Sequence, residues 1–239
     1  MDHQHAAEHV KYRVANAPVC EYPFPHFFIE DIFPTDYFSQ IIKNWPGTDR
    51  FISIADTNRT SGDSYRERHI VNLPKIREEQ SWEGKEFWEE VSSWFLGDNF
   101  LTFIVERYLP WIKGGRELAE SIDVSADGLL VQDHTGYEIG PHTDAPHRLV
   151  STLFYCPEDD STAELGTSIY VPNSDEVETK ISPKHHGRHL FDKVYTAPYI
   201  PNSLFGFVVS PNSFHGVDKV TSRNVQRKAI LHFAKLNQQ

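Results

Sequence analysis

His142 and Asp144, which are separated by one residue, are the pair in this chain best suited to hold a metal. They form its one His-x-Asp/Glu match, although it contains 13 histidines and 34 acidic residues. Alternate side chains of a β-strand point to the same face, so both can reach one ion from a single strand. His215 would have to come from a separate strand. Two imidazoles and one carboxylate are typical of non-haem Fe(II) sites with open coordination positions.

An arginine after His215 is suited to bind a carboxylate, because its planar fork donates two parallel hydrogen bonds. Arg227 begins a strand-like segment, residues 227–233, whose alternate side chains would face the interior of a sheet structure. Arg223 is the alternative, since it lies closer to His215 but in a turn-like stretch. The strand-like alternation favours Arg227 over Arg223 as the arginine that binds the carboxylate.

The segment 128–233 resembles the 2-oxoglutarate- and Fe(II)-dependent dioxygenase superfamily, and within it the prolyl-hydroxylase-like branch. The motifs that carry the resemblance are, in chain order, Gly136, His142-x-Asp144, Arg148 to Tyr155, Gly166 to Pro172, His215-Gly-Val217 and Arg227. One position departs from the family pattern: Asp133 stands where an aromatic residue often precedes the first metal histidine.

The resemblance implies Fe(II), 2-oxoglutarate and O2 as cofactor and cosubstrates. It implies that His142, Asp144 and His215 hold the iron at the catalytic centre and that Arg227 holds the far carboxylate of 2-oxoglutarate. Further cosubstrate contacts are expected from either Thr152 or Tyr155 on the strand after the metal pair.

Two other residues near the expected site are further candidates for contacts with the cosubstrate. Gln132, on the strand before His142, could face the same pocket, and Arg148 is a weaker candidate. Residues 47–84 and the loop 184–190 are expected to flank the mouth of the site and to be more mobile than the β-core. Residues 184–189 form a loop with three histidines, and residues 66–69 could bind an anionic group of the substrate.

Composition narrows the possible partners and location. The net charge is −11, and no basic face is visible in the sequence, so we expect no nucleic-acid binding. Two cysteines without framework spacing fit a reducing compartment. The sequence has no apolar run of membrane-span length and no signal-peptide core, which predicts a cytoplasmic protein without a membrane partner.

The chain is expected to form a single domain. Residues 1–127 would be a helical or mixed support region, and residues 128–239 a double-stranded β-helix, the jelly-roll or cupin-like core. The fold class is therefore mainly β with N-terminal helices. In the support region we expect the following: a loose arm at 1–20, an aromatic strand at 22–33, a helix from Thr35 to Pro46, a long polar loop at 47–84, and helices at 84–96 and 99–109. The core is expected to contain strands at 128–133, 137–142, 148–155, 167–172, 193–199, 204–209, 212–217 and 227–235.

The function predicted from these features is hydroxylation of a small-molecule substrate with release of succinate and CO2. The intact carboxylate of Asp144 favours oxygenation, because halogenating relatives leave that ligand position open. Two alternatives remain, a prolyl-type peptide hydroxylase and a jelly-roll binding module that has lost its iron.

Overall fold

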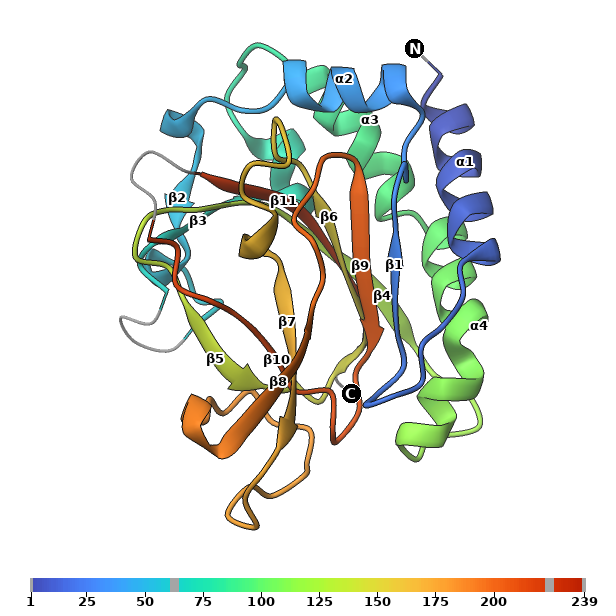
Figure 1. Cartoon of the computed structure of the whole chain (residues 1–239). Helices are drawn as coiled ribbons and strands as arrows, with labels where there is room; N and C mark the ends of the chain where they lie inside the picture. The colour runs from blue at the N-terminus through green and yellow to red at the C-terminus, as the bar shows by residue number, and fades with distance from the viewer. Residues whose placement is uncertain (1, 61–64, 222–225, 238–239) are drawn as a thin grey trace.

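Two antiparallel β-sheets lie face to face and enclose an apolar interior (Figure 1). The computed structural model describes residues 2–60, 65–221 and 226–237. The strand order is β1-β9-β6-β11-β4-β3-β2 in the large sheet and β5-β10-β7-β8 in the small sheet. This is the arrangement of a double-stranded β-helix, so the predicted fold class is confirmed.

The strands of the large sheet are β1 (His26–Ile29), β2 (Ile52–Ser53), β3 (Arg68–Asn72), β4 (Val124–Asp133), β6 (Arg148–Tyr155), β9 (Ser203–Val208) and β11 (Arg227–Leu236). The strands of the small sheet are β5 (Ile139–His142), β7 (Thr167–Pro172), β8 (Phe191–Thr196) and β10 (His215–Val217). The eight strands predicted for 128–239 are all present, although β5 and β10 are shorter than expected.

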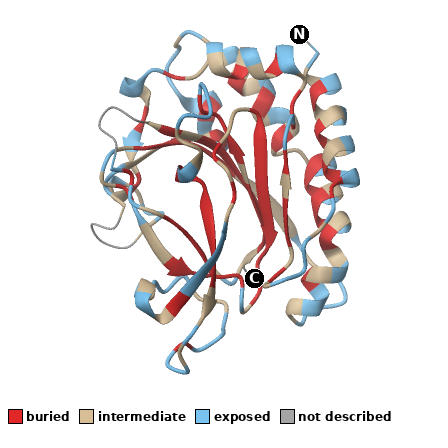
Figure 2. Cartoon of the chain, viewed as in Figure 1, coloured by how far each residue is buried: buried red, intermediate tan, exposed pale blue. Residues whose placement is uncertain are grey.

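In the part of the chain that the structure describes, α-helices cover the outer face of the large sheet (Figure 1). They are α1 (His3–Asn16), α2 (Thr35–Lys43), α3 (Lys85–Phe95) and α4 (Asp98–Gly115). Figure 2 shows that the helix faces turned toward the sheet are buried and the opposite faces are exposed. The helices therefore support the large sheet and leave its other face to line the interior.

The central strand β11 is buried on both faces. Ile230 and Ala234 belong to the cluster beneath the helices, whereas Ala229, Leu231 and Phe233 belong to the cluster between the two sheets. Because side chains alternate along a strand, odd-numbered residues of β11 face the interior and even-numbered ones face the helices. Antiparallel pairing carries the same alternation onto β4 and β6.

The expectation of a loose arm at residues 1–20 is wrong. Helix α1 begins after Asp2, whose carboxylate accepts a hydrogen bond from the His5 amide at 3.0 Å. Ala6, Val10 and Val14 are spaced by four residues and are fully buried. This spacing gives a helix one apolar face, and packing of that face stabilises the segment.

The expectation of a long loop at residues 47–84 is also wrong for the part that the structure describes. Strands β2 and β3 extend the large sheet beyond β4, and the 3₁₀-helix η3 (Leu73–Glu78) follows them. Ile70 and Val71 are both buried because β3 is covered on its two faces. The polar residues on either side obscured this short apolar run. The support region thus contributes strands as well as helices.

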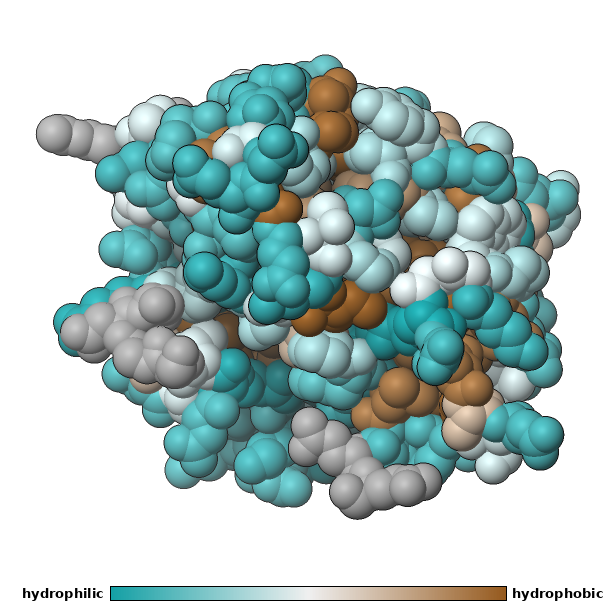
Figure 3. Space-filling model, turned by 90° about the horizontal axis from the view of Figure 1, so that it is seen from below, coloured by the Kyte–Doolittle hydropathy of each residue, from teal (hydrophilic) through white to brown (hydrophobic). Residues whose placement is uncertain are grey.

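Seen from below, the surface is mostly hydrophilic, with small groups of hydrophobic residues at the top, at the centre and toward the lower right of the view (Figure 3). Among the described residues, no helix combines the length and apolar character needed to cross a membrane.

Candidate metal centre

His142, Asp144 and His215 come together where β5 meets β10. Each offers one potential ligand atom, and these atoms all lie within 4.8 Å of one another. The three residues are 7%, 7% and 8% exposed, so the group is sheltered from bulk water. The predicted metal residues are therefore assembled by the fold.

The hydrogen bonds of the two histidines leave the metal-facing nitrogens free. His142 Nδ1 lies 3.0 Å from the Gly140 carbonyl oxygen, and His215 Nδ1 lies 3.0 Å from the Ser213 carbonyl oxygen. A carbonyl can only accept, so each Nδ1 donates and each neutral ring keeps its lone pair on Nε2. Such outer hydrogen bonds orient metal-binding imidazoles.

Asp144 is held as a charged carboxylate by two neighbours. Arg148 Nη1 donates to Oδ1 at 2.7 Å, and the Ser151 hydroxyl donates to Oδ2. Burial acts to raise the pKa of Asp144, but the positive charge of Arg148, aided by the hydrogen bond from Ser151, keeps that pKa well below its ordinary value. Asp144 is therefore ionised at neutral pH.

Burial keeps both imidazoles neutral. It is the largest cause that lowers the pKa of His142 well below 6.5, and the nearby His215 lowers it further. Burial also lowers the pKa of His215, to which the charges of Arg148 and Arg68 add. Two neutral imidazoles and one charged carboxylate fit the donor set of a mononuclear Fe(II) centre.

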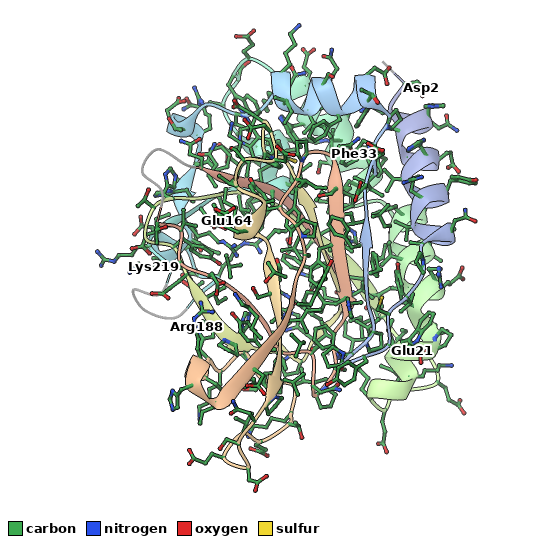
Figure 4. The ribbon with its side chains drawn as sticks, viewed as in Figure 1. Asp2, Glu21, Phe33, Glu164, Arg188 and Lys219 are labelled. Atoms are coloured by element: carbon green, nitrogen blue, oxygen red, sulfur yellow. The ribbon has the colours of Figure 1, made fainter. Side chains whose placement is uncertain are left out.

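Two segments far apart in sequence meet beside this group. The ring of His185 lies 4.9 Å from the ring of His142, measured between centroids, and its Nε2 contacts the hydroxyl of Tyr65. Arg188, labelled in Figure 4, anchors the His185 loop by donating to the Val217 carbonyl at 2.7 Å and to Asp218 at 2.9 Å. The prediction that residues from 47–84 and 184–190 flank the site is confirmed for Tyr65 and His185.

Arg227 lies in the interior with the ring of Tyr155 beside it. The guanidinium carbon is 5.3 Å from the Tyr155 ring centroid, and Arg227 is fully buried. Its partner in this structure is the chain's own Asp133, whose Oδ2 accepts from Nη1 at 2.9 Å. Arg227 Nε also donates to the Leu165 carbonyl at 2.6 Å.

Comparison with known proteins gives a match by structure alone. No family model and no curated protein sequence matches the chain. A prolyl hydroxylase from Trichoplax adhaerens, in complex with a peptide fragment of hypoxia inducible factor, has a TM-score of 0.54 at 15% identity. The match covers 96% of this chain and 88% of that one.

This chain shares the fold of that prolyl hydroxylase. Two further structures have lower scores. A Pseudomonas putida prolyl-4-hydroxylase has a TM-score of 0.47 at 12% identity, covering 96% of this chain and 98% of that one. The epimerase SnoN, in complex with Fe3+, alpha ketoglutarate and nogalamycin RO, has a TM-score of 0.49 at 11% identity, covering 96% and 83%. The match to the Trichoplax adhaerens structure confirms, at the level of fold, the resemblance found in the sequence.

Thr152 and Gln132 do not reach the interior between the two sheets. Thr152 pairs with the even-numbered His232 on β11 and donates to its carbonyl at 3.2 Å. Gln132 pairs with Lys228, which is also even-numbered. Both side chains therefore lie on the helix-facing side of the large sheet, and the expectation that they line the pocket is wrong. The alternative anchor Arg223 lies outside the described residues.

The sequence did not single out Ser151 or the pairing role of Asp133. Ser151 and Tyr155 share a face of β6, since they are four residues apart, and the contact of Ser151 with Asp144 shows that this face is the interior one. Asp133 was noted only as a departure from the family pattern. A charged residue at the buried end of a strand was the available signal, because a buried charge requires a partner.

Proposed function

We propose that this protein is an Fe(II)- and 2-oxoglutarate-dependent oxygenase that hydroxylates a small molecule and releases succinate and CO2. The observation that carries this proposal is the group of His142, Asp144 and His215, with ligand atoms within 4.8 Å of one another. Both imidazoles keep Nε2 free, and the carboxylate is charged. The prolyl hydroxylase fold supports the same reading.

The residues of the chain prepare the site for this chemistry. His142, Asp144 and His215 would hold Fe(II), which supplies O2 activation coupled to oxidative decarboxylation of 2-oxoglutarate. Ser151 and Arg148 fix both oxygens of Asp144. Apolar and aromatic side chains between the sheets exclude water around the site; they include Leu129, Val131, Phe205, Phe207, Val217 and Leu231.

The surroundings of the metal group favour a small substrate. Tyr65 and His185 contact one another, and the ring of His185 lies beside that of His142, so two chain segments meet next to the metal group. Side chains that meet there would reduce the space for an extended peptide. This observation favours a metabolite over a polypeptide.

A peptide hydroxylase is the second candidate. The observation that favours it is the fold match to a prolyl hydroxylase whose structure contains a peptide fragment. A third possibility, a jelly-roll binding module without iron, disagrees with the intact set of metal ligands.

The test is a turnover screen of the Fe(II)-loaded protein with 2-oxoglutarate under air. Succinate is measured against panels of amino acids, sugars, lipids and proline-containing peptides. We expect a metabolite to stimulate succinate formation, and the Asp144→Ala variant to form none above background. Stimulation by peptides alone would establish the second candidate. Absence of Fe(II) binding after anaerobic reconstitution would establish the binding module.

A further inference from the structure

Three charged residues stand side by side on neighbouring strands of the large sheet. Arg68 on β3 and Arg227 on β11 are both paired directly with Asp133 on β4. Arg68 Nε and Nη2 donate to Oδ1 and Oδ2 of Asp133 at 2.6 and 2.9 Å. Since Arg227 Nη1 also donates to Oδ2 at 2.9 Å, both arginines share one carboxylate.

The two arginines differ in how accessible they are. The side chains of Arg227 and Asp133 are both 0% exposed, whereas that of Arg68 is 15% exposed. The rings of Tyr155 and Tyr199 each lie 5.3 Å from the Arg227 guanidinium carbon. Arg227 is therefore enclosed by aromatic rings and its own hydrogen bonds, and Arg68 is the arginine that an incoming ligand can reach.

The charges of this group do not cancel. Two guanidinium groups face one carboxylate, and among the described residues no other acidic side chain is within salt-bridge distance of either arginine. The two positive charges also repel one another, since Arg68 opposes the rise in the pKa of Arg227. A buried excess charge is costly unless it is paired, so this arrangement is suited to receive an anion.

The hydroxyl of Tyr137 is a hydrogen-bond donor close to Arg68. Tyr137 is 0% exposed, and among the residues that the structure describes its hydroxyl has no hydrogen-bond partner. The guanidinium carbon of Arg68 lies 4.5 Å from the centroid of its ring. Tyr137 precedes β5, the strand that ends at His142, so the hydroxyl and the metal group belong to one continuous stretch of chain. An unpaired buried hydroxyl beside an unbalanced guanidinium is a site for a carboxylate.

We propose that Arg68 and the hydroxyl of Tyr137 bind the far carboxylate of 2-oxoglutarate, while Asp133 holds Arg68 and Arg227 in place. This inference rests on the proposed function, because it assigns the cosubstrate's carboxylate to particular residues. It differs from the expectation that Arg227 is the direct anchor. Arg227 is fully buried and gives Nη1 to Asp133 and Nε to the Leu165 carbonyl. Arg68 binds Asp133 through Nε and Nη2, and among the described residues its Nη1 has no hydrogen-bond partner, so it can donate to a ligand.

The test compares two keto acids on protein loaded with Mn(II), which fills the metal site without turnover. Calorimetry gives the dissociation constants of 2-oxoglutarate and of 2-oxopentanoate, which has a methyl group in place of the far carboxylate. We expect Arg68→Gln to weaken 2-oxoglutarate binding about tenfold or more and Tyr137→Phe to weaken it roughly threefold to tenfold. Neither variant should change the binding of 2-oxopentanoate.

Arg59→Gln is the matched control. Arg59 donates to both oxygens of Asp127 at 2.9 and 3.0 Å, and Asp127 lies on the same strand β4. This variant removes an equivalent arginine–aspartate pair without touching Asp133, and both dissociation constants should stay unchanged. Tyr137→Phe keeps the buried ring, so it provides the second variant if Arg68→Gln fails to fold.

The other outcomes separate the two proposals. Unchanged 2-oxoglutarate binding in Arg68→Gln and Tyr137→Phe, with weaker binding in Arg227→Gln, would overturn the assignment and leave the proposed function intact. Equal weakening of both keto acids by Arg68→Gln would also overturn it, because it would indicate a purely structural role. A wild-type protein that binds Mn(II) but neither keto acid would overturn the proposed function itself.

Discussion

His215 lies directly opposite His142 in the antiparallel pair of β10 with β5, and their ring centroids are 4.4 Å apart. The two residues are distant in sequence, so their approach depends on the register of this short pair. A shift of one residue would turn one imidazole to the opposite face of the sheet. The geometry of the metal group is therefore set by backbone pairing of the small sheet.

Removing one ligand should abolish iron binding without unfolding the protein. We expect His142→Ala and His215→Ala each to lose Fe(II), because the remaining two ligands hold the ion poorly. Calorimetric titration with Fe(II) under anaerobic conditions measures this, and circular dichroism checks the fold. His189→Ala is the control, since His189 is exposed and lies outside the metal group. Retention of full affinity in either ligand variant would contradict the assignment.

Ser151 should affect the metal through Asp144. Its hydroxyl donates to Asp144 Oδ2, and loss of such an outer partner typically weakens metal binding about 10- to 100-fold. We expect Ser151→Ala to show an effect in this range in the Fe(II) titration. Thr152→Val is the matched control, because Thr152 faces the helices and should leave metal affinity unchanged. The reverse result would mean that the two faces of β6 are exchanged.

The stability of the protein should fall on mild acidification because of His232. Burial lowers its pKa to about 3, and its ring lies against Phe95 and Phe100 with neither nitrogen hydrogen-bonded within the described structure. The His232 ring stays neutral in the folded state, whereas in the unfolded state it takes up a proton below pH 6.5. The free energy of unfolding therefore decreases as pH falls from 6.5 toward 3, by ~2 kcal/mol between pH 7 and pH 5 from this residue.

Urea unfolding at pH 7 and pH 5 measures this effect. His232→Phe should reduce the pH dependence by about one proton, because the variant has no titrating group at this position. An identical pH dependence in wild type and variant would show that His232 is not held neutral. Since other buried histidines contribute equally to both proteins, they cancel in the comparison.

The contact of Tyr65 with His185 should slow the opening of the loop beside the metal group. Tyr65→Phe removes the hydroxyl, and one hydrogen bond contributes about 0.5–1.5 kcal/mol. Hydrogen exchange of amides in 184–190 is expected to become several-fold faster, with no change in β6. Equal exchange rates in wild type and variant would mean that the contact does not restrain the loop.

Spacing in the sequence was sufficient to predict the metal group and the core strands. Both depend on local alternation and on a few polar residues at strand ends, which can be read from the sequence directly. The sequence could not decide whether Thr152 or Tyr155 contacts the cosubstrate. These residues are three apart and lie on opposite faces of one strand, and tertiary contacts such as that between Ser151 and Asp144 show which face is interior.

The remaining differences arise from tertiary pairing. Strand β3 is a short apolar run between polar residues, and it forms because β4 offers a free edge. The shared carboxylate of Asp133 depends on β3 and β11 lying on either side of β4. No local sequence pattern predicts that three strands distant in sequence place Arg68, Asp133 and Arg227 in one row.

The most direct test of the central claim is an anaerobic titration of the Fe(II)-loaded protein with 2-oxoglutarate, followed by visible absorbance. A keto acid that chelates Fe(II) produces a charge-transfer band, so the signal requires both the metal group and the cosubstrate site. We predict a band that saturates at one 2-oxoglutarate per iron and one iron per chain, and none in Asp144→Ala. An iron-loaded wild-type protein without a band, or an Asp144→Ala variant with the full band, would contradict the account.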